Sequence, residues 1–285
     1  MSSVSISTNN LTIGYRQTAG GGKVNGNVII QRDLTFALRE GEMVCMLGPN
    51  GCGKSTLLRT LAGLQPALGG EFVINQPSNL QPLKQGAAAQ TSKPSNSGSA
   101  AQTVALVLTE RLSMDNTTVH DVVALGRYPY SSFLDGLTEA DERIIAESLQ
   151  QVGFQLPTSN SPTSINYQLS TINSFFNAHS DGEKQRILIA KALAQQTPVI
   201  LLDEPTAHLD LPHRILVLRL LRRLAHEQGK TILISTHELD LALALSDRIL
   251  LMTPGRGVQL DTAENLKQAD SFTAAFGMDI FNPLG

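Results

Sequence analysis

The chain has 285 residues, of which 41% are hydrophobic, so it is long enough for one large domain or two small ones and can bury a core. Its 22 basic and 25 acidic side chains give a net charge of −3 without any block of Lys or Arg, so electrostatic binding to nucleic acid is not expected. Residues 1–10 lack the basic and apolar regions of a signal peptide, and no apolar run reaches the ~18 residues of a membrane span. We therefore expect an intracellular chain that does not itself cross a membrane.

The N-terminal part is expected to combine antiparallel strands with one strand–loop–helix unit. Apolar patches alternate with turn residues at the start of the chain, and glycines at 20–22 mark a hairpin tip. Residues 43–47 read as a continuous apolar strand, and leucines at helical spacing after a glycine-rich turn predict a helix over 54–64.

Strands and helices alternate through the rest of the chain. We expect strands at residues 104–108, 199–202, 231–235 and 249–252, and helices near 119–125, 138–152, 182–194, 211–228 and 239–245. Such alternation predicts an α/β fold with a mainly parallel sheet covered on both faces. Polar stretches at 76–103 and 157–166 are interpreted as surface insertions, because the motifs on either side of them must meet in one site.

A phosphate-binding loop follows the strand at 43–47. Residues 48–55 match the pattern G-x-x-x-x-G-K-[ST], in which glycines let backbone N–H groups curl around phosphate oxygens at a helix N-terminus. Lys54 is expected to reach the β- and γ-phosphates and Ser55 to hold Mg²⁺. The alternative is a glycine-rich turn that merely precedes a helix, but the strand, the spacing and the Lys-Ser pair all favour a nucleotide site. The expected ATP-contacting residues of the loop are Gly48, Pro49, Asn50, Gly51, Cys52, Gly53, Lys54, Ser55 and Thr56.

A second strand, residues 199–202, ends in Asp203 and Glu204. Ligands of parallel sheets lie at the carboxyl ends of strands, so both acids are expected to face the same phosphates as Lys54. Asp203 suits a direct or indirect Mg²⁺ ligand, and Glu204 suits a carboxylate that polarises the attacking water. Acids are also common turn residues after a strand, and the phosphate loop is what favours the catalytic interpretation.

The segment Ser180-Asp181-Gly182-Glu183-Lys184-Gln185, upstream of this acidic strand, resembles the signature sequence of ATP-binding cassette (ABC) proteins. Ser180 is a good helix N-cap, Glu183 closes a capping box with it, and Gly182 leaves backbone exposed; an ordinary helix start is the alternative. The resemblance implies a P-loop NTPase cassette with a mainly parallel core sheet, an N-terminal antiparallel β subdomain and an α-helical subdomain that carries the signature.

Three further positions match the same family. Tyr15 looks like the aromatic residue on which adenine stacks, although a tyrosine at a strand end is also a common packing residue. Asp210, in Ala-His-Leu-Asp after the acidic strand, looks like part of the loop that communicates between the two subunits of the dimer. His237 looks like the switch histidine that contacts the γ-phosphate. In this family, cassettes pair head to tail with each ATP between the phosphate loop of one subunit and the signature of the other, which implies a homodimer or a pair with a similar cassette.

Residues 108–110 and 119–130 narrow the resemblance to one subgroup, because they look like the same segments in the cassettes of ferric-siderophore, haem and cobalamin importers. A similar Gly-Arg-x-Pro segment there follows the loop that faces the permease. The alternative is that these residues only pack the helical subdomain. The implied layout is one ATP-binding domain at 1–261, with the helical subdomain at about 111–196, and a C-terminal tail at 262–285.

The sequence departs from the family at a few positions. Glu110 stands where most cassettes have a Gln that touches Mg²⁺ or its water, so we include it among the metal ligands and expect a stronger Mg²⁺ dependence. His179 stands where Leu usually precedes the signature serine, either as a packing group or as a weakened signature. Cys52 is a small residue in a permissive position or, alternatively, a redox switch. The basic face of residues 211–228 is solvated or meets a partner or anionic lipid.

The sequence therefore predicts the ATP-hydrolysing subunit of an importer for a ferric siderophore, haem or cobalamin. Its predicted cofactors are ATP and Mg²⁺, and its partners are a second copy of the chain, a membrane permease and, indirectly, a substrate-binding protein, with no nucleic acid. Its predicted location is the cytoplasmic face of the bacterial inner membrane. The alternative is a soluble ABC ATPase of an assembly or regulatory complex, such as one for iron–sulfur clusters, without a permease.

Overall fold

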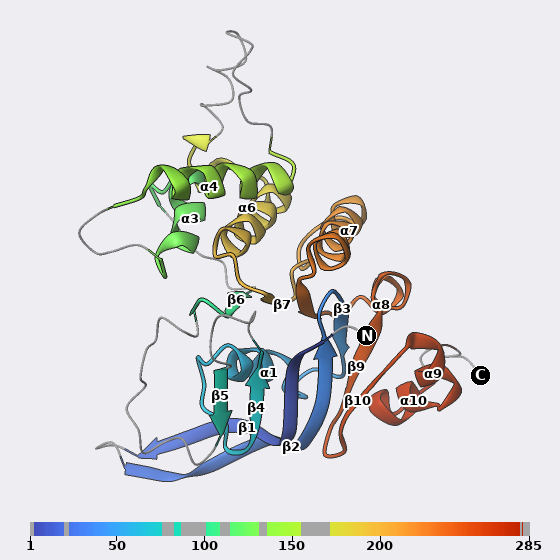
Figure 1. Ribbon diagram of the computed structural model, residues 1–285. Coiled ribbons are helices and arrows are strands. Elements are labelled where there is room, and N and C mark those ends of the chain that lie inside the picture. Colours follow the sequence, from blue (N-terminus) through green and yellow to red (C-terminus); the bar gives the residue numbers. More distant parts are fainter. Residues whose placement is uncertain are drawn as a thin grey trace. The chain divides into compact units, whose positions relative to one another are not determined.

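The structure is a computed structural model that describes residues 3–19, 23–75, 83–86, 101–108, 115–130, 136–154, 172–279 and 281 (Figure 1). The chain divides into two compact units, which we call the core unit and the helical unit. The core unit comprises Met1–Leu106, Pro198–Glu204 and Leu221–Gly285, and the helical unit comprises Val107–Thr197 and Pro205–Leu220. Among the described residues, none of the helices combines the length and the apolar character needed to cross a bilayer.

The core unit contains a six-stranded sheet of order β10-β9-β3-β8-β7-β6. Its strands are β3 (Met43–Leu47), β6 (Val104–Val107), β7 (Val199–Asp203), β8 (Thr231–Ser235), β9 (Arg248–Thr253) and β10 (Gly257–Asp261). Strands β9, β3, β8 and β7 run parallel, and every residue of β3, β7 and β8 is buried, as in sheets covered on both faces. This confirms the α/β fold with a mainly parallel sheet, whereas the antiparallel edge strand β10 was not predicted.

The second sheet of this unit has four strands in the order β2-β1-β4-β5. They are β1 (Val4–Ala19), β2 (Lys23–Arg39), β4 (Gly69–Ile74) and β5 (Leu83–Gly86). The antiparallel pairing of β1 with β2 confirms the predicted hairpin, while β4 was missed. Strand β5 pairs with β4 and lies inside the stretch 76–103 that we interpreted as a surface insertion, so residues 83–86 of that stretch form a strand. Residues 76–82, 87–100 and 155–171 lie outside the described part, and the insertions stay a prediction.

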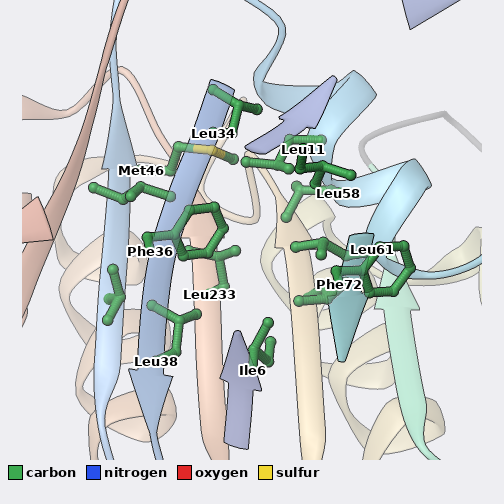
Figure 2. Packing of buried hydrophobic residues seen from close by; sticks show 14 of the residues in the cluster. Ile6, Leu11, Leu34, Phe36, Leu38, Met46, Leu58, Leu61, Phe72 and Leu233 are labelled. Carbon is green, nitrogen blue, oxygen red and sulfur yellow. The ribbon is translucent and has the colours of Figure 1, made fainter. Parts of the chain in front are cut away.

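The two sheets share one hydrophobic core with helix α1 (Lys54–Leu61), the helix that follows the phosphate loop (Figure 2). Leu58 and Leu61 of α1 are fully buried in the same cluster as Phe36 of β2, Met46 of β3 and Phe72 of β4. Large apolar side chains buried in this way contribute about 1.5–3 kcal/mol each. The core therefore holds the start of α1 at a set place relative to the parallel sheet.

Helix α1 ends at Leu61 rather than at the predicted residue 64, and a backbone motif accounts for the difference. Gly63 adopts a left-handed φ of 75°, its N–H donates to Thr60 O at 3.0 Å, and the N–H of Leu64 donates to Arg59 O at 3.0 Å. This pair of bonds is a glycine-terminated helix end, which satisfies carbonyls that the helix would otherwise leave open.

Helices α3, α4 and α6 of the helical unit each begin with a capping box. Its elements are α3 (Val119–Ala124), η2 (Leu125–Arg127), α4 (Glu139–Gln151), η3 (Phe176–Ala178) and α6 (Asp181–Ala194). The predicted cap of α6 at Ser180 is confirmed, and Thr138 and Thr118 cap α4 and α3 in the same way. Reciprocal bonds of this kind satisfy orphan backbone donors and set where each helix starts.

The C-terminal elements are α7 (Leu211–Gln228), which begins in the helical unit and ends in the core unit, α8 (Leu239–Leu245), α9 (Ala263–Gln268) and α10 (Ser271–Phe276). Leu218, Leu221 and Leu224 of α7 are buried and Arg219 and Arg223 are exposed, as the helical periodicity predicts. In the tail, Phe272 is buried and meets the ring of Phe281 edge-on, with 5.3 Å between ring centroids. That the basic face of α7 meets a partner or anionic lipid stays a hypothesis.

Candidate functional site

The phosphate loop has a backbone path that only glycine permits at two of its positions. A Cβ on Gly48 would lie 2.6 Å from Met252 O, and a Cβ on Gly53 would lie 2.8 Å from Ile30 Cγ2 with φ at 104°. Gly53 is the N-cap of α1 and offers no side chain to cap the helix, so the first amides of α1 are available to a ligand. The loop is thus a concave set of N–H donors at a positive helix end, which fits a nucleotide phosphate chain.

The lysine of the motif lies across this loop. Lys54 is buried, and its Nζ donates to Gly48 O at 2.8 Å and to Pro49 O at 3.2 Å. These carbonyls place the ammonium within the loop rather than on the outer face of α1. From there it can supply one positive charge to phosphate oxygens, as the sequence predicts.

Tyr15 of β1 reaches the same helix start. Its hydroxyl forms a 2.9 Å hydrogen bond with Thr56 Oγ1, and the residue is 45% exposed. The structure thus brings the predicted adenine-stacking residue to the first turn of α1, next to Ser55, with part of its ring open to solvent. An exposed ring fixed at its hydroxyl end fits a stacking role, which stays a prediction.

The acidic strand end is built around a serine that sequence reasoning missed. Ser235 Oγ, at the end of β8, donates to Asp203 Oδ1 at 2.5 Å and accepts from the Glu204 backbone N–H at 3.0 Å. Asp203 is buried, and Glu204 takes a left-handed φ of 48°. Such a backbone is uncommon outside glycine and is retained where the surroundings enforce it. The only signal of this serine in the sequence is its place as the last residue of a strand.

Two of the predicted catalytic residues, Glu204 and His237, contact each other. His237 Nε2 lies 2.6 Å from Glu204 Oε1, with side chains 44% and 34% exposed. The carboxylate is therefore oriented by an imidazole at the end of the adjacent strand while it stays open to water. A carboxylate held in this way can polarise a water molecule for attack on a phosphate.

The predicted signature residues belong to the helical unit. Ser180 and Glu183 form the capping box of α6, and a Cβ on Gly182 would lie 3.1 Å from His213 Cδ2. His213 Nδ1 also contacts the carboxylate of Asp210. His213, which sequence reasoning did not single out, thus links the signature glycine to the loop after the acidic strand.

For a divalent cation, the described residues offer the Ser55 hydroxyl and the Asp203 carboxylate, while Glu110 lies outside the described part of the chain. Mg²⁺ commonly keeps several waters and takes one or two protein oxygens together with substrate phosphates. Hard oxygen donors of this kind fit Mg²⁺. Within the described residues no group of three or more His, Cys, Asp or Glu side chains is gathered around one point.

Cys52 is expected to react slowly, because burial raises the pKa of its thiol, with Lys54 opposing the shift only in part. The thiolate is the nucleophile, so iodoacetamide near neutral pH should modify Cys52 at least about 10-fold more slowly in the folded protein than in urea. Peptide mass spectrometry over time measures this rate, with buried Cys45, whose pKa rises to about 12, as internal comparison. Rapid labelling of Cys52 in the folded chain would instead support the redox-switch alternative.

Comparison with known proteins agrees with this geometry. The family model for ABC transporters matches residues 31–207. The iron(3+)-hydroxamate import ATP-binding protein of Bacillus subtilis is 32% identical over 275 residues, which cover 96% of this chain and 88% of that protein. The chain also resembles a solved ABC transporter, classed as metal-chelate type, in an inward-facing conformation (TM-score 0.73, 26% identity, 97% of this chain and 90% of that one).

A dimeric bacterial ABC transporter cassette is similar as well, with a TM-score of 0.66 and 25% identity over 90% of this chain and 98% of that one. The family match includes the phosphate loop and the acidic strand end, which carry the geometry described above. The chain therefore belongs to the ABC transporter family, as an ATP-binding ATPase subunit.

Proposed function

We propose that this chain is the ATPase subunit of an importer for a ferric siderophore, haem or cobalamin, working with a separate membrane permease. The catalytic part of this proposal rests on the contact between Glu204 and His237, which belong to the core unit together with the phosphate loop. The import direction and the substrate class are supported by the iron-hydroxamate import relative and by the metal-chelate type transporter of similar fold. We further propose that it acts at the cytoplasmic face of the bacterial inner membrane.

The proposed working form is a head-to-tail homodimer around a pair of ATP molecules, which the dimeric form of a similar cassette supports. Each chain has one phosphate loop and one signature segment, so a complete pair of sites needs a second cassette. In this arrangement, ATP on the loop of one protomer would be contacted by the partner subunit's Ser180 and the partner subunit's Gly182. ATP binding would then close the dimer and hydrolysis would reopen it.

Within one protomer, each residue has a distinct proposed task. The amides of the phosphate loop and the Lys54 ammonium hold the phosphates and offset their charge. Glu204 would polarise the attacking water, and His237 would hold the carboxylate in place and contact the γ-phosphate. Ser55 and Asp203 would hold Mg²⁺, which supplies charge neutralisation of the phosphate oxygens.

The experiment that tests this function uses a tagged Glu204→Gln chain incubated with membranes of the source organism, ATP and Mg²⁺. A variant that binds ATP without turning it over should accumulate in its closed, permease-bound form. After gentle solubilisation and affinity capture, mass spectrometry is expected to find a multi-span permease. The matched control is Lys54→Ala, which should not close around ATP and should recover much less permease. Capture of soluble proteins alone, from membranes shown to be intact, would favour an assembly ATPase and overturn the importer proposal.

A further inference from the structure

His179 lies directly before the signature serine, and its ring is held at both nitrogens. Nε2 forms a 2.6 Å hydrogen bond with Ser174 Oγ, and Nδ1 lies 3.5 Å from Glu183 Oε2. The side chain is 11% exposed. A leucine, the residue that the family pattern favours at this position, could fill the space but could form neither contact.

The carboxylate that faces His179 is the one that closes the signature capping box. Glu183 Oε2 accepts from the Ser180 backbone N–H at 3.1 Å and from Ser180 Oγ at 2.9 Å. These bonds to Ser180 are the main cause of a lowered pKa of the Glu183 carboxyl, and the charge of His179 lowers it further. A single carboxylate oxygen therefore connects the imidazole to the signature hydroxyl.

The ring is placed by a segment that is itself anchored to the start of α3. Ser174 O accepts from the Val119 N–H at 3.0 Å, and the N–H of buried Phe176 donates to Thr117 O at 2.8 Å. On its other side the His179 ring meets Phe154 edge-on, with 6.2 Å between ring centroids. The imidazole is thus fixed by Ser174, by Phe154 after the end of α4 and by Glu183 of α6.

The other charged groups on the elements packed here have partners of their own. Arg186 donates to Val152 O at 3.3 Å and lies over the Phe154 ring. Lys184 pairs with Asp181 at 3.9 Å, and Asp115 accepts from Asn177 at 2.9 Å. Among the described residues, Glu183 is accordingly the charged group with which His179 interacts.

We propose that His179 is a positioning residue for the signature, which holds the Glu183 carboxylate and thereby sets the direction of the Ser180 hydroxyl. An imidazole that carries a proton on Nδ1 can donate to Glu183 and accept at Nε2 from the Ser174 hydroxyl, so one ring can hold both partners together. The inference rests on the proposed function, in which the partner subunit's Ser180 contacts the phosphates of ATP.

The test compares the ATPase kinetics of wild type and His179→Leu and separates KM from kcat. We expect the KM for ATP of the variant to exceed that of wild type by about 3–10-fold, with kcat little changed. In a Glu183→Gln background, His179→Leu should have no further effect on KM, because the coupled group is gone.

The matched control is His120→Leu, which removes a different His–Glu pair of the helical unit, in which Nε2 lies 2.8 Å from Glu142 Oε2. Its KM should stay within about 2-fold of wild type. If His179→Leu leaves KM unchanged, or if its effect on KM persists in the Glu183→Gln background, the ring is only a packing group and the proposal is wrong.

A second measurement keeps this test independent of folding defects and of the proposed function. Ser174→Ala retains the imidazole and removes one anchor, and should show a smaller loss in the same direction. Carboxyl NMR of the Glu183 side chain should show a raised pKa in His179→Leu, because a neighbouring positive charge is lost. This holds even if the wild-type chain hydrolyses no ATP, an outcome that would refute the proposed function alone. An unchanged Glu183 pKa would overturn the coupling itself.

Discussion

Replacing Glu204 by Gln is expected to lower the turnover of ATP by about 100-fold or more while ATP binding is retained. Gln has nearly the shape of Glu, so the left-handed backbone at this position and the bonds of its N–H to Ser235 should persist. What is lost is the negative charge that contacts His237 and that we propose polarises water. The phosphate loop, which we propose to be the main binding element for ATP, is not altered.

Phosphate release gives kcat, and equilibrium titration with a fluorescent ATP analogue gives the affinity. The matched control is Glu142→Gln, which breaks the pair of Glu142 with His120 in the helical unit and should leave the turnover of the isolated subunit within about 2-fold of wild type. Turnover of Glu204→Gln close to wild type would remove Glu204 from the catalytic role. Loss of ATP affinity together with turnover would show that Glu204 acts mainly in binding.

Replacing Arg127 by Ala is expected to lower the free energy of unfolding by about 3–5 kcal/mol, because it leaves a buried ion pair with one member. Arg127 and Asp141 are both buried, and Nε lies 2.8 Å from the Asp141 carboxylate. The guanidinium also donates to Ala194 O at 2.7 Å and to Gln196 Oε1 at 3.0 Å, and it lies over the Tyr130 ring. The residue thus ties the end of η2 to α4 and to the end of α6.

Urea unfolding followed by circular dichroism measures this loss. The matched control is Arg143→Ala, an exposed arginine of α4 that faces exposed Glu139 at 3.6 Å, and its effect should stay below about 0.5 kcal/mol. A loss for Arg127→Ala no larger than for the control would show that the pair contributes nothing to folding. The segment from Gly126 to Tyr130 would then be free to serve only a partner.

The Arg127–Asp141 pair also predicts that the free energy of unfolding depends on pH in the acid range. Bonds from the Thr138 hydroxyl and N–H, and then Arg127, lower the pKa of Asp141 to about 2. A carboxyl whose pKa is lowered by folding stabilises the protein above its unfolded pKa of about 3.9 and loses this contribution as pH falls toward the folded value. In Arg127→Ala the Asp141 pKa should rise, so the part of the acid-induced loss between about pH 4 and pH 2 that belongs to Asp141 should shrink.

Much of the fold follows from local patterns in the chain. The buried strands β3, β7 and β8 are continuous apolar runs, and the starts of α4 and α6 are marked by Thr138 and Ser180 with an acid three residues later. The strands β4 and β10 lack such a run, because they lie at partly exposed positions of their sheets, and their pairing with β1 and β9 defines them. Pairing of this kind is a non-local property, so a local pattern does not reveal it.

The features of the candidate site also fall into two groups, those that local sequence predicts and those that depend on tertiary contacts. The sequence by itself determined the phosphate loop, the acidic strand end and the signature, because each is a run of neighbouring residues whose spacing reflects backbone geometry. Only the tertiary structure decided that Ser235 holds both Asp203 and the Glu204 amide, that His237 meets Glu204, and that His213 lies against Gly182. These contacts join segments that are adjacent only after strands align and helices pack. Their geometry therefore depends on the register of the sheet and on the shape of the core, which no single segment specifies.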